Sequence, residues 1–481
     1  MKNWLLAFRN LLRNRRRSMT TLFAMVIGLT SVLVFGGYAG NINYGLQTQF
    51  VQHGGHLQIQ HRNYFLYGSG DPVSYGLADY EHIIEAVKSD PELARLVTVV
   101  TPVLAVNGIA GNFAAGVSRT VFGSGIVVAD QNRMRLWNDY GFPSTPKDLA
   151  LTATSPDSAL IGTGVARVLR LCGPLKVSDC APQDAPAGWP GKSSQGDHEP
   201  EAEGAQPVAA PSDIAQLATL EANANTKAPE PHGARIELLT SNAYGAPNVA
   251  ELKIVEAQKQ AVKDVDDMFV QLHLAQAQRL VYGGGKPEVT SIVVQLKHTS
   301  QLGVARERLN ALLHTTLQGQ PLEVLDFETL NPQYGQITGM FAAVFGFIAV
   351  MIATIVMFTV GNTMNMAVME RTKEIGTLRA IGVRGSGIRN IFLCEGFLLG
   401  TCGAVLGTLF ALLAAALINH SGLHWTPPGQ TDPVALTVRV WGETGMIVRN
   451  ALGVIVVATF SAWWPARRAA RMLIVDSLRF A

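Results

Sequence analysis

Four long runs of mainly apolar residues alternate with polar stretches along this chain of 481 residues. The hydrocarbon core of a bilayer requires about 20 consecutive apolar residues in a helix. The pattern therefore predicts four transmembrane helices, at residues 18–40, 336–365, 390–419 and 446–465. The second lies within a run of 41 uncharged residues, 329–369, so we expect that helix to extend beyond the membrane.

The stretch between the first two spans, residues 41–335, has the polarity of a water-exposed domain. Apolar alternation and β-branched runs predict strands, at residues 56–60, 97–109, 119–128, 235–240 and 289–296. Apolar residues at helical spacing predict helices, at residues 79–87, 265–280 and 301–313. The expected fold class is a membrane protein with four transmembrane α-helices and a large α+β domain inserted between helices 1 and 2.

One segment of that domain, residues 184–232, is rich in Pro, Ala, Glu and Ser. Such a composition buries too little apolar surface to order a chain. We therefore expect a flexible insert that divides the domain.

Charge places the spans relative to the membrane. Only 15% of the residues are charged, whereas soluble proteins average about 25%. Basic residues cluster at 1–17, 371–389 and 467–479, and the loop at 420–445 has Arg439 as its only Lys or Arg. The positive-inside rule then predicts cytoplasmic termini and an external domain.

The N-terminal segment, residues 1–17, holds six basic residues, no acidic residue and apolar residues at helical spacing. It is predicted to be an amphipathic helix on the cytoplasmic surface. The alternative is a signal peptide, but the 23 uncharged residues that follow are too long for its hydrophobic region. The segment after the fourth span, 466–481, is predicted to be a cytoplasmic tail.

The loop at 366–389 is unusual because five charges follow a long uncharged run within ten residues. Ile375, Leu378 and Ile381 recur every three residues, which predicts one apolar side of a short helix. Gly382 stands where a left-handed C-terminal cap is expected. A basic membrane flank would explain the positive charges alone, whereas a docking helix also explains Glu370, Glu374 and the apolar spacing.

These residues fit the pattern N-M-x-V-x-E-R-x-x-E-I-G-x-x-R-A-x-G, which resembles the cytoplasmic loop of the FtsX/MacB family of ABC transporter permeases. The resemblance implies a coupling helix that contacts a separate ATPase subunit. The residues assigned to this coupling role are Glu370, Arg371, Glu374, Ile375, Gly376, Arg379 and Gly382. Looser matches, at 161–166 and 266–280, resemble the periplasmic core domain of MacB-type permeases.

The tail at 465–479 also resembles the C-terminal signature of this family, with departures at Ile474 and Ser477. The resemblance implies a dimer, with a second permease copy or a paralogue, and an ABC ATPase dimer that binds ATP and Mg, so that this chain needs no cofactor. It places the protein in the bacterial inner membrane, with both termini cytoplasmic. The domain at 41–335 is then periplasmic, as is the loop at 420–445.

Because the sequence begins with the amphipathic segment, its arrangement resembles the lipoprotein-releasing permeases LolC and LolE, without a fused ATPase. The expected function is ATP-driven extraction of an amphiphilic substrate, such as a lipoprotein, from membrane lipid. Alternatives are peptide or drug efflux and an FtsX-like scaffold that signals to an envelope enzyme. No nucleic acid is expected as a partner.

Enzyme chemistry finds little support in the sequence. No G-x-x-x-x-G-K-[ST] motif occurs, and no catalytic triad or paired acid stands out. His53, His56 and His61 do not match a known metal-site spacing, and solvated histidines are the simpler interpretation. We predict no catalytic residue and no metal site.

The four cysteines lie in two different parts of the chain. Cys172 and Cys180 lie in the predicted outer domain, where an oxidising compartment would allow a disulfide, although two free thiols remain the alternative. Cys394 and Cys402 lie in the third span and are predicted to be packing residues.

The third span carries one acid and a row of glycines. Glu395 stands near the cytoplasmic end, where interfacial solvation is the favoured interpretation over a functional intramembrane acid. Gly396, Gly400, Gly403 and Gly407 predict a face for close helix packing.

Overall fold

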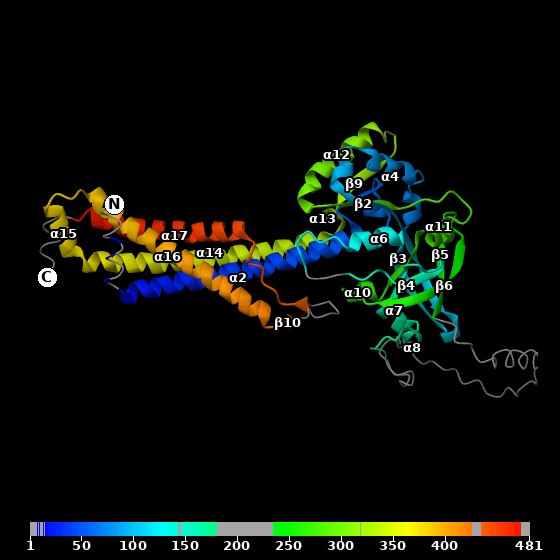
Figure 1. Ribbon diagram of the computed structural model, residues 1–481, viewed down its shortest axis with the longest axis horizontal. Helices are drawn as coiled ribbons and strands as arrows, with labels where there is room; N and C mark the ends of the chain where they lie inside the picture. The colour runs from blue at the N-terminus through cyan, green and yellow to red at the C-terminus, as the bar shows by residue number, and fades with distance from the viewer. Residues whose placement is uncertain are drawn as a thin grey trace, which may run out of the picture.

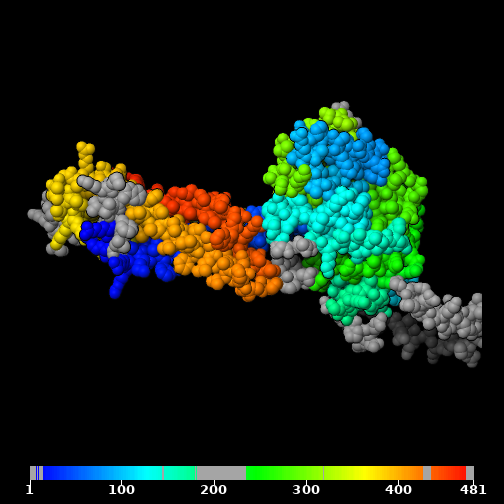
Figure 2. Space-filling view, viewed as in Figure 1, coloured from blue at the N-terminus to red at the C-terminus, as the bar shows by residue number. Residues whose placement is uncertain are grey.

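The computed structural model describes residues 7, 9, 13, 15–142, 146–178, 180, 234–317, 319–425 and 434–472. The predicted insert at 184–232 lies outside these residues, as do most of the segment at 1–17 and the tail after residue 472. A long helical bundle is joined end to end to a broader domain built on a β-sheet (Figures 1 and 2).

Among the residues described, four helices have the length and composition to cross a membrane, and every one is longer than the predicted span. They are α2 (Arg15–Gly54), α14 (Pro332–Glu370), α16 (Gly385–His420) and α17 (Thr444–Ala470). At 1.5 Å per residue, the 40 residues of α2 reach about 60 Å, twice the thickness of the hydrocarbon core. The helix therefore continues 14 residues past the expected end of the first span at residue 40, because hydropathy marks only the part that suits lipid.

Glycines hold the bundle together at close range. A methyl group built on Gly396 would lie 2.7 Å from Ala462 Cβ of α17, and one built on Gly403 would lie 2.9 Å from Met25 Cβ of α2. Gly400 and Gly407 approach the same two helices at 3.0 Å. The predicted glycine packing face is confirmed, and it serves contacts within the chain.

The sheet domain contains nine paired strands among the residues described. They are β1 (Leu57–His61), β2 (Val97–Asn112), β3 (Val117–Ile126), β4 (Ser158–Gly162), β5 (Arg235–Ser241), β6 (Pro247–Gln258), β7 (Phe269–His273), β8 (Ser291–Leu296) and β9 (Leu322–Asp326). The order is β3-β7-β4-β6-β5-β2-β8-β1-β9, and β2 also pairs with β3. Six of these strands therefore close into a ring, while β8, β1 and β9 extend from the first half of β2.

The other helices are short. All of them belong to the sheet domain except α15, which lies between α14 and α16. They are α3 (Tyr64–Tyr67), η1 (Pro72–Tyr75), α4 (Tyr80–Ser89), α5 (Leu93–Leu96), η2 (Phe113–Ala115), α6 (Val128–Arg135), α7 (Thr163–Val168), α8 (Cys172–Leu175), α10 (Lys263–Asp266), α11 (Leu274–Tyr282), η3 (Thr299–Gln301), α12 (Leu302–Thr315), α13 (Phe327–Leu330) and α15 (Thr372–Ala380). Apolar side chains of α4, α11 and α12 are buried in one core with the strands. A small hairpin, β10 (His424–Trp425) with β11 (Val434–Ala435), follows α16.

The predicted helix at 265–280 is wrong over its middle. Residues Phe269–His273 form β7, between β3 and β4, and α11 begins only at Leu274. Three consecutive residues of β7 are buried, so the strand lacks the alternation that marks a half-exposed strand. A short apolar run of this kind reads equally well as a helix segment.

The two longest helices enter the sheet domain side by side. Helix α2 leads through Gly55, with a φ of +70°, into β1, while β9 leads through α13 into α14. Strands β1 and β9 are antiparallel partners, with Leu57 opposite Asp326, and the Phe327 amide donates to the His56 carbonyl at 3.0 Å. The ends of α2 and α14 are therefore fixed to one strand pair.

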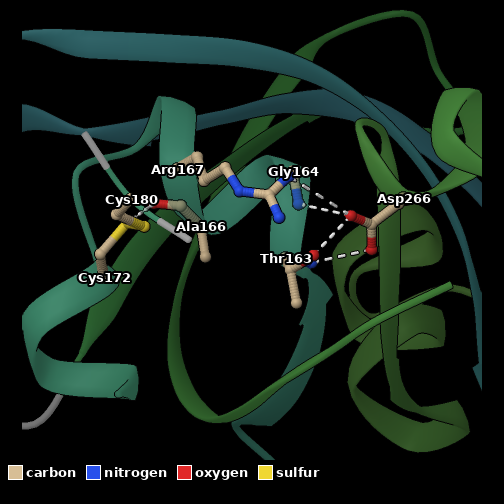
Figure 3. The surroundings of a disulfide bond; sticks show 7 residues. All are labelled: Thr163, Gly164, Ala166, Arg167, Cys172, Cys180 and Asp266. Atoms are coloured by element: carbon tan, nitrogen blue, oxygen red, sulfur yellow. Dashed lines mark hydrogen bonds and ion pairs between the residues drawn. A yellow bond between two sulfur atoms is a disulfide. The ribbon is translucent and has the colours of Figure 1, made fainter. Parts of the chain in front are cut away.

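A buried carboxylate fixes the start of α7. Asp266 of α10 is 1% exposed and accepts hydrogen bonds from the amides of Thr163 and Gly164, at 2.9 and 2.8 Å (Figure 3). It also accepts a hydrogen bond from the Gln260 amide at 2.9 Å. The first amides of a helix lack intrahelical partners, and the residue before α7 is a glycine, so Asp266 supplies the cap from a distant element. A methyl group on Gly162 would overlap the Asp266 carbonyl oxygen. This contact joins the two segments that carry the looser family resemblance.

The adjacent turn contains a disulfide in the structure between Cys172 of α8 and Cys180, with Cα atoms 6.2 Å apart (Figure 3). For so short a loop, the chain-entropy model limits the stabilisation to about 2.5 kcal/mol. We expect Cys172→Ser to lower the free energy of unfolding by no more than this amount. Non-reducing peptide mass spectrometry checks the bond directly, and two alkylatable thiols in the mature protein would contradict it.

Candidate functional site

Helix α15 lies at the end of the bundle remote from the sheet domain (Figure 1). It is separated from α14 by Arg371, whose φ of −100° and ψ of 14° interrupt the helix. At its other end, Gly382 has a φ of +98°, the Gly382 amide donates to the Arg379 carbonyl, and the Val383 amide donates to the Leu378 carbonyl. This is a Schellman cap, so the left-handed conformation predicted for Gly382 is confirmed.

The end of α14, Arg371 and α15 form a corner, called the α15 corner below. A buried ion pair lies on its inner side. Arg371 Nη1 lies 2.8 Å from Glu395 Oε1 of α16, and the two residues are 6% and 2% exposed. The interpretation of Glu395 as a solvated interfacial acid is therefore wrong. Sequence spacing offered one clue, an arginine and an intramembrane acid on neighbouring helices, but the pairing itself depends on how α14 and α16 pack.

Two further acids of the corner bind the start of α2. Arg17 donates from both Nη atoms to Glu370, at 2.6 and 3.0 Å, and Arg13 donates to both carboxylate oxygens of Glu374, at 2.8 and 3.0 Å. The Arg13 and Glu374 side chains are each 54% exposed, so their pair contributes little to stability. These contacts hold the end of α14 and α15 against the segment at and just before the start of α2, and no local pattern in the sequence indicates them.

Arg379 binds the C-terminal end of α17. Its Nη1 donates to the Ala470 carbonyl at 2.7 Å, and a methyl group on Gly385 would lie 2.9 Å from the same oxygen. The last carbonyls of a helix lack intrahelical partners and attract positive charge. Through Glu370, Glu374, Arg371 and Arg379, the corner is linked to α2, α16 and α17.

The outer surface of the corner is exposed and carries apolar side chains. Ile375 is 4% exposed and Gly376 is buried, whereas Leu378 is 38% and Ile381 is 77% exposed. The prediction that three apolar residues share one side of a helix is thus wrong in detail, because α15 ends at Ala380 and only Ile375 packs inward. Leu378 and Ile381 instead form an exposed apolar patch near Lys373, which is also exposed.

Basic residues from separate parts of the sequence gather at this end of the bundle. The start of α2, the α15 corner and the end of α17 are in contact there. They carry Arg13, Arg15, Arg16, Arg17, Lys373, Arg379, Arg384, Arg389, Arg467, Arg468 and Arg471. The three clusters that the sequence separates are therefore one surface.

Metal ligation is not indicated in the part of the chain that the structure describes, where no group of three or more His, Cys, Asp and Glu residues could hold an ion. The three histidines singled out in the sequence have separate surroundings. His53 contacts the Gln49 carbonyl, His56 accepts from the Leu296 amide, and His61 contacts the Arg62 carbonyl.

Comparison with known proteins finds a family match in the helical part of the chain. Residues 346–474, which contain all of α15, α16 and α17 and most of α14, match the FtsX-like permease C-terminal domain. Over 233 residues the chain is 25% identical to an uncharacterised ABC transporter permease, MJ1507, of Methanocaldococcus jannaschii, which covers 48% of this chain and 55% of that protein.

Two further relatives carry functional names. The macrolide export ATP-binding/permease protein MacB of Shewanella sp. is 27% identical over 194 residues, 40% of this chain and 28% of that protein. The lipoprotein-releasing system transmembrane protein LolC of Neisseria meningitidis is 24% identical over 251 residues, 49% of this chain and 56% of that protein. The chain thus spans about half or less of the length of these relatives. With four apolar helices of membrane-spanning length among the described residues, the chain is a multi-pass membrane protein, and its residues 346–474 match the FtsX-like permease C-terminal domain that is found in ABC transporter permeases such as those named above.

Proposed function

We propose that this chain is the permease subunit of an ABC transporter, that α15 docks on a separate ATPase subunit, and that the sheet domain works on the opposite, periplasmic side of the membrane. The observation that carries the proposal is the single basic surface around α15. Lys and Arg accumulate on the cytoplasmic side of membrane proteins. With α15 in the cytoplasm, the sheet domain at the other end of the bundle is external.

Tryptophans support this placement in the bilayer. Trp464 near the end of α17 is 66% exposed, and Trp441 just before Thr444, where α17 begins, is 69% exposed. Twenty helical residues separate Thr444 from Trp464, about 30 Å, which matches the hydrocarbon core. Exposed tryptophans are favoured at both membrane interfaces.

The continuous helices support a mechanical role. The α15 corner is bonded to the start of α2 and follows directly on α14, and both of these helices run to the β1–β9 pair. A displacement of α15 by the ATPase would therefore be transmitted to the sheet domain without passing through a flexible linker. ATP and Mg would be bound by that partner.

The outer face of α14 supports a second permease subunit, identical or paralogous. This face is apolar and exposed over several turns, at Met340, Val344, Phe347, Val350, Ile355 and Phe358. In the bundle half near the sheet domain it would extend beyond lipid, given the length of α14. A second copy that packs against this face would remove it from water.

For the substrate, an apolar groove of about 440 Å³ favours an amphiphile, a lipoprotein first. The groove lies between α2, α16 and the segment after the β10–β11 hairpin, and its lining includes Ser31, Phe35, Tyr38 and Trp425. Ser31 and Tyr38 lie about 20–30 Å along α2 from Arg17, which supports a position of the groove in the outer leaflet. The glycine face of α16 is not available to a substrate, because α2 and α17 pack against it.

The test is ATP hydrolysis in liposomes that contain the permease with its ATPase subunit. We expect an acylated lipoprotein to stimulate hydrolysis and its non-acylated form to have no effect, because transfer of each acyl CH₂ out of lipid costs about 0.8 kcal/mol. Ser31→Trp fills the groove and should abolish the stimulation. Ile27→Trp, one turn away on an exposed position of α2, is the matched control and should leave it intact.

Equal stimulation by both forms would contradict lipid extraction and favour peptide or drug efflux. Hydrolysis that responds to no substrate would favour a signalling scaffold of the FtsX type.

A further inference from the structure

A cavity of about 600 Å³ lies in the sheet domain, on a side away from the bundle, and takes no part in the proposed coupling. Three segments enclose it: the stretch at 70–74 before and within η1, the β5–β6 turn at 241–245, and the end of α11 with the loop that follows, at 282–288. These segments are far apart in sequence, so only the folded domain assembles their side chains.

The unusual group in this cavity is Tyr282, the last residue of α11. The residue is 6% exposed, and its hydroxyl oxygen is buried without a hydrogen-bond partner among the residues that the structure describes. Buried tyrosine hydroxyls ordinarily find a partner, because an unmade hydrogen bond is costly. A buried polar atom without a partner requires an explanation, and here the adjoining cavity has room for a group that would bind it.

Glu288 borders the same small space. A methyl group built on Gly76 would overlap Glu288 Oε2 and would lie 3.1 Å from the Tyr282 hydroxyl oxygen. Burial raises the pKa of the Glu288 carboxyl, and nearby Lys286 lowers it. Burial, together with the charge of Glu288, raises the pKa of the Tyr282 phenol, so the phenol stays neutral and its oxygen can accept a hydrogen bond.

The charge of the lining is negative. Lys286 on the rim is the one basic residue of the lining against two acidic residues, and its Nζ is bound to Asp79 at 2.8 Å. The acidic residues are Asp71 and Glu288, and the Asp71 carboxylate accepts a hydrogen bond from the Ser74 hydroxyl. Two carboxylates beside an oxygen acceptor and two tyrosine rings, Tyr244 and Tyr282, favour a ligand that is cationic and donates hydrogen bonds.

We propose that this cavity binds a protonated amine, with the ammonium group donating to the Glu288 carboxylate and to the Tyr282 hydroxyl oxygen. A metal ion is the weaker alternative, because the described residues offer no group of three potential ligands here. The amine can belong to a small molecule or to a lysine side chain of a peptide. The site is independent of ATP coupling and is tested without it.

The experiment uses the full chain in nanodiscs and measures binding by saturation-transfer NMR and calorimetry. The probes are phenethylamine, its neutral analogue 2-phenylethanol, the tripeptide amide Ala-Lys-Ala, and Ca²⁺. We expect both amines to bind, and the alcohol and Ca²⁺ neither to bind nor to compete. Tighter binding of the tripeptide would assign the site to peptides, and tighter binding of phenethylamine to small amines.

Three variants test the contacts. Glu288→Gln keeps the shape and should weaken amine binding about tenfold or more, as loss of a charged hydrogen bond requires. Tyr282→Phe should weaken it several-fold while the unfolding temperature stays constant or rises, because an unsatisfied hydroxyl is removed. Asp71→Asn probes the opposite wall if Glu288→Gln does not fold, and Glu307→Gln on the exposed face of α12 should change nothing.

Equal binding of phenethylamine and 2-phenylethanol would overturn the proposal. So would displacement of the amine by Ca²⁺, unchanged affinity in the Glu288 and Asp71 variants, or a lower unfolding temperature for Tyr282→Phe, which would assign the hydroxyl a structural role.

Discussion

Replacing Glu395 by Leu is expected to lower the stability of the bundle by roughly 3–5 kcal/mol, the largest single-residue loss that we predict. The carboxylate is 2% exposed and lies 2.8 Å from Arg371, so its removal leaves a guanidinium buried beside apolar helices. Unfolding by SDS titration or by heat in detergent micelles measures the effect.

The double variant Arg371→Met with Glu395→Leu separates the pair from its surroundings. Two apolar side chains of similar volume replace a buried ion pair at little cost, so stability should return close to that of the natural protein. Glu374→Gln is the matched control, because Glu374 and Arg13 are both 54% exposed and their pair contributes at most about 1 kcal/mol. A loss below about 1 kcal/mol for Glu395→Leu would show that the pair is solvated in the membrane.

Replacing Ile381 by Asp is expected to weaken capture of the ATPase subunit by about 30-fold or more, with no change in the unfolding temperature. The side chain is 77% exposed beyond the end of α15, so it contributes nothing to the fold, and a central apolar contact of an interface is worth about 2 kcal/mol or more. Affinity purification of the ATPase on the immobilised permease measures the loss. Val304→Asp, at a 60% exposed position of α12 in the sheet domain, is the control.

The same assay decides what Glu374 does. Glu374→Lys breaks the contact with Arg13 and also changes the surface that we propose to face the ATPase. The exchange Arg13→Glu with Glu374→Lys restores the contact within the chain. Recovery of capture would assign Glu374 to positioning α15, and continued loss would assign it to the ATPase interface. Normal capture by Ile381→Asp would exclude the outer patch of α15 as the docking surface.

The sequence was informative wherever the signal is local. Hydropathy located all four long helices, the glycine spacing in α16 identified its packing face, and Gly382 marked a helix end. Alternation located β1, and β-branched runs located β2, β3, β5 and β8 to within a few residues. Each of these features depends on a residue and its near neighbours, through backbone conformation or side-chain periodicity.

The lengths of the helices and the fully buried strand β7 could not be predicted from local sequence patterns. Helix α2 continues to Gly54 because the sheet domain and α14 support it, although residues 41–54 are too polar to register as a span. Strand β7 is buried between two neighbours and therefore carries no alternation. In both cases tertiary contacts decide the conformation, and a window of sequence does not contain those contacts.

In the corner around α15, too, some features follow from the local sequence and others only from tertiary packing. The sequence by itself determined that residues 366–389 carry a charged helix between two spans, because charge density and the glycine cap are properties of that segment. Only the tertiary structure decided the partners: Arg371 with Glu395, Glu370 with Arg17, Glu374 with Arg13, and Arg379 with the end of α17. Ion pairs are short-ranged, so they form between groups that helix packing brings within about 4 Å, whatever their separation in the sequence. The Tyr282 hydroxyl is a further feature that only the tertiary structure decided, since its burial and its lack of a hydrogen-bond partner among the described residues depend on how the cavity is folded.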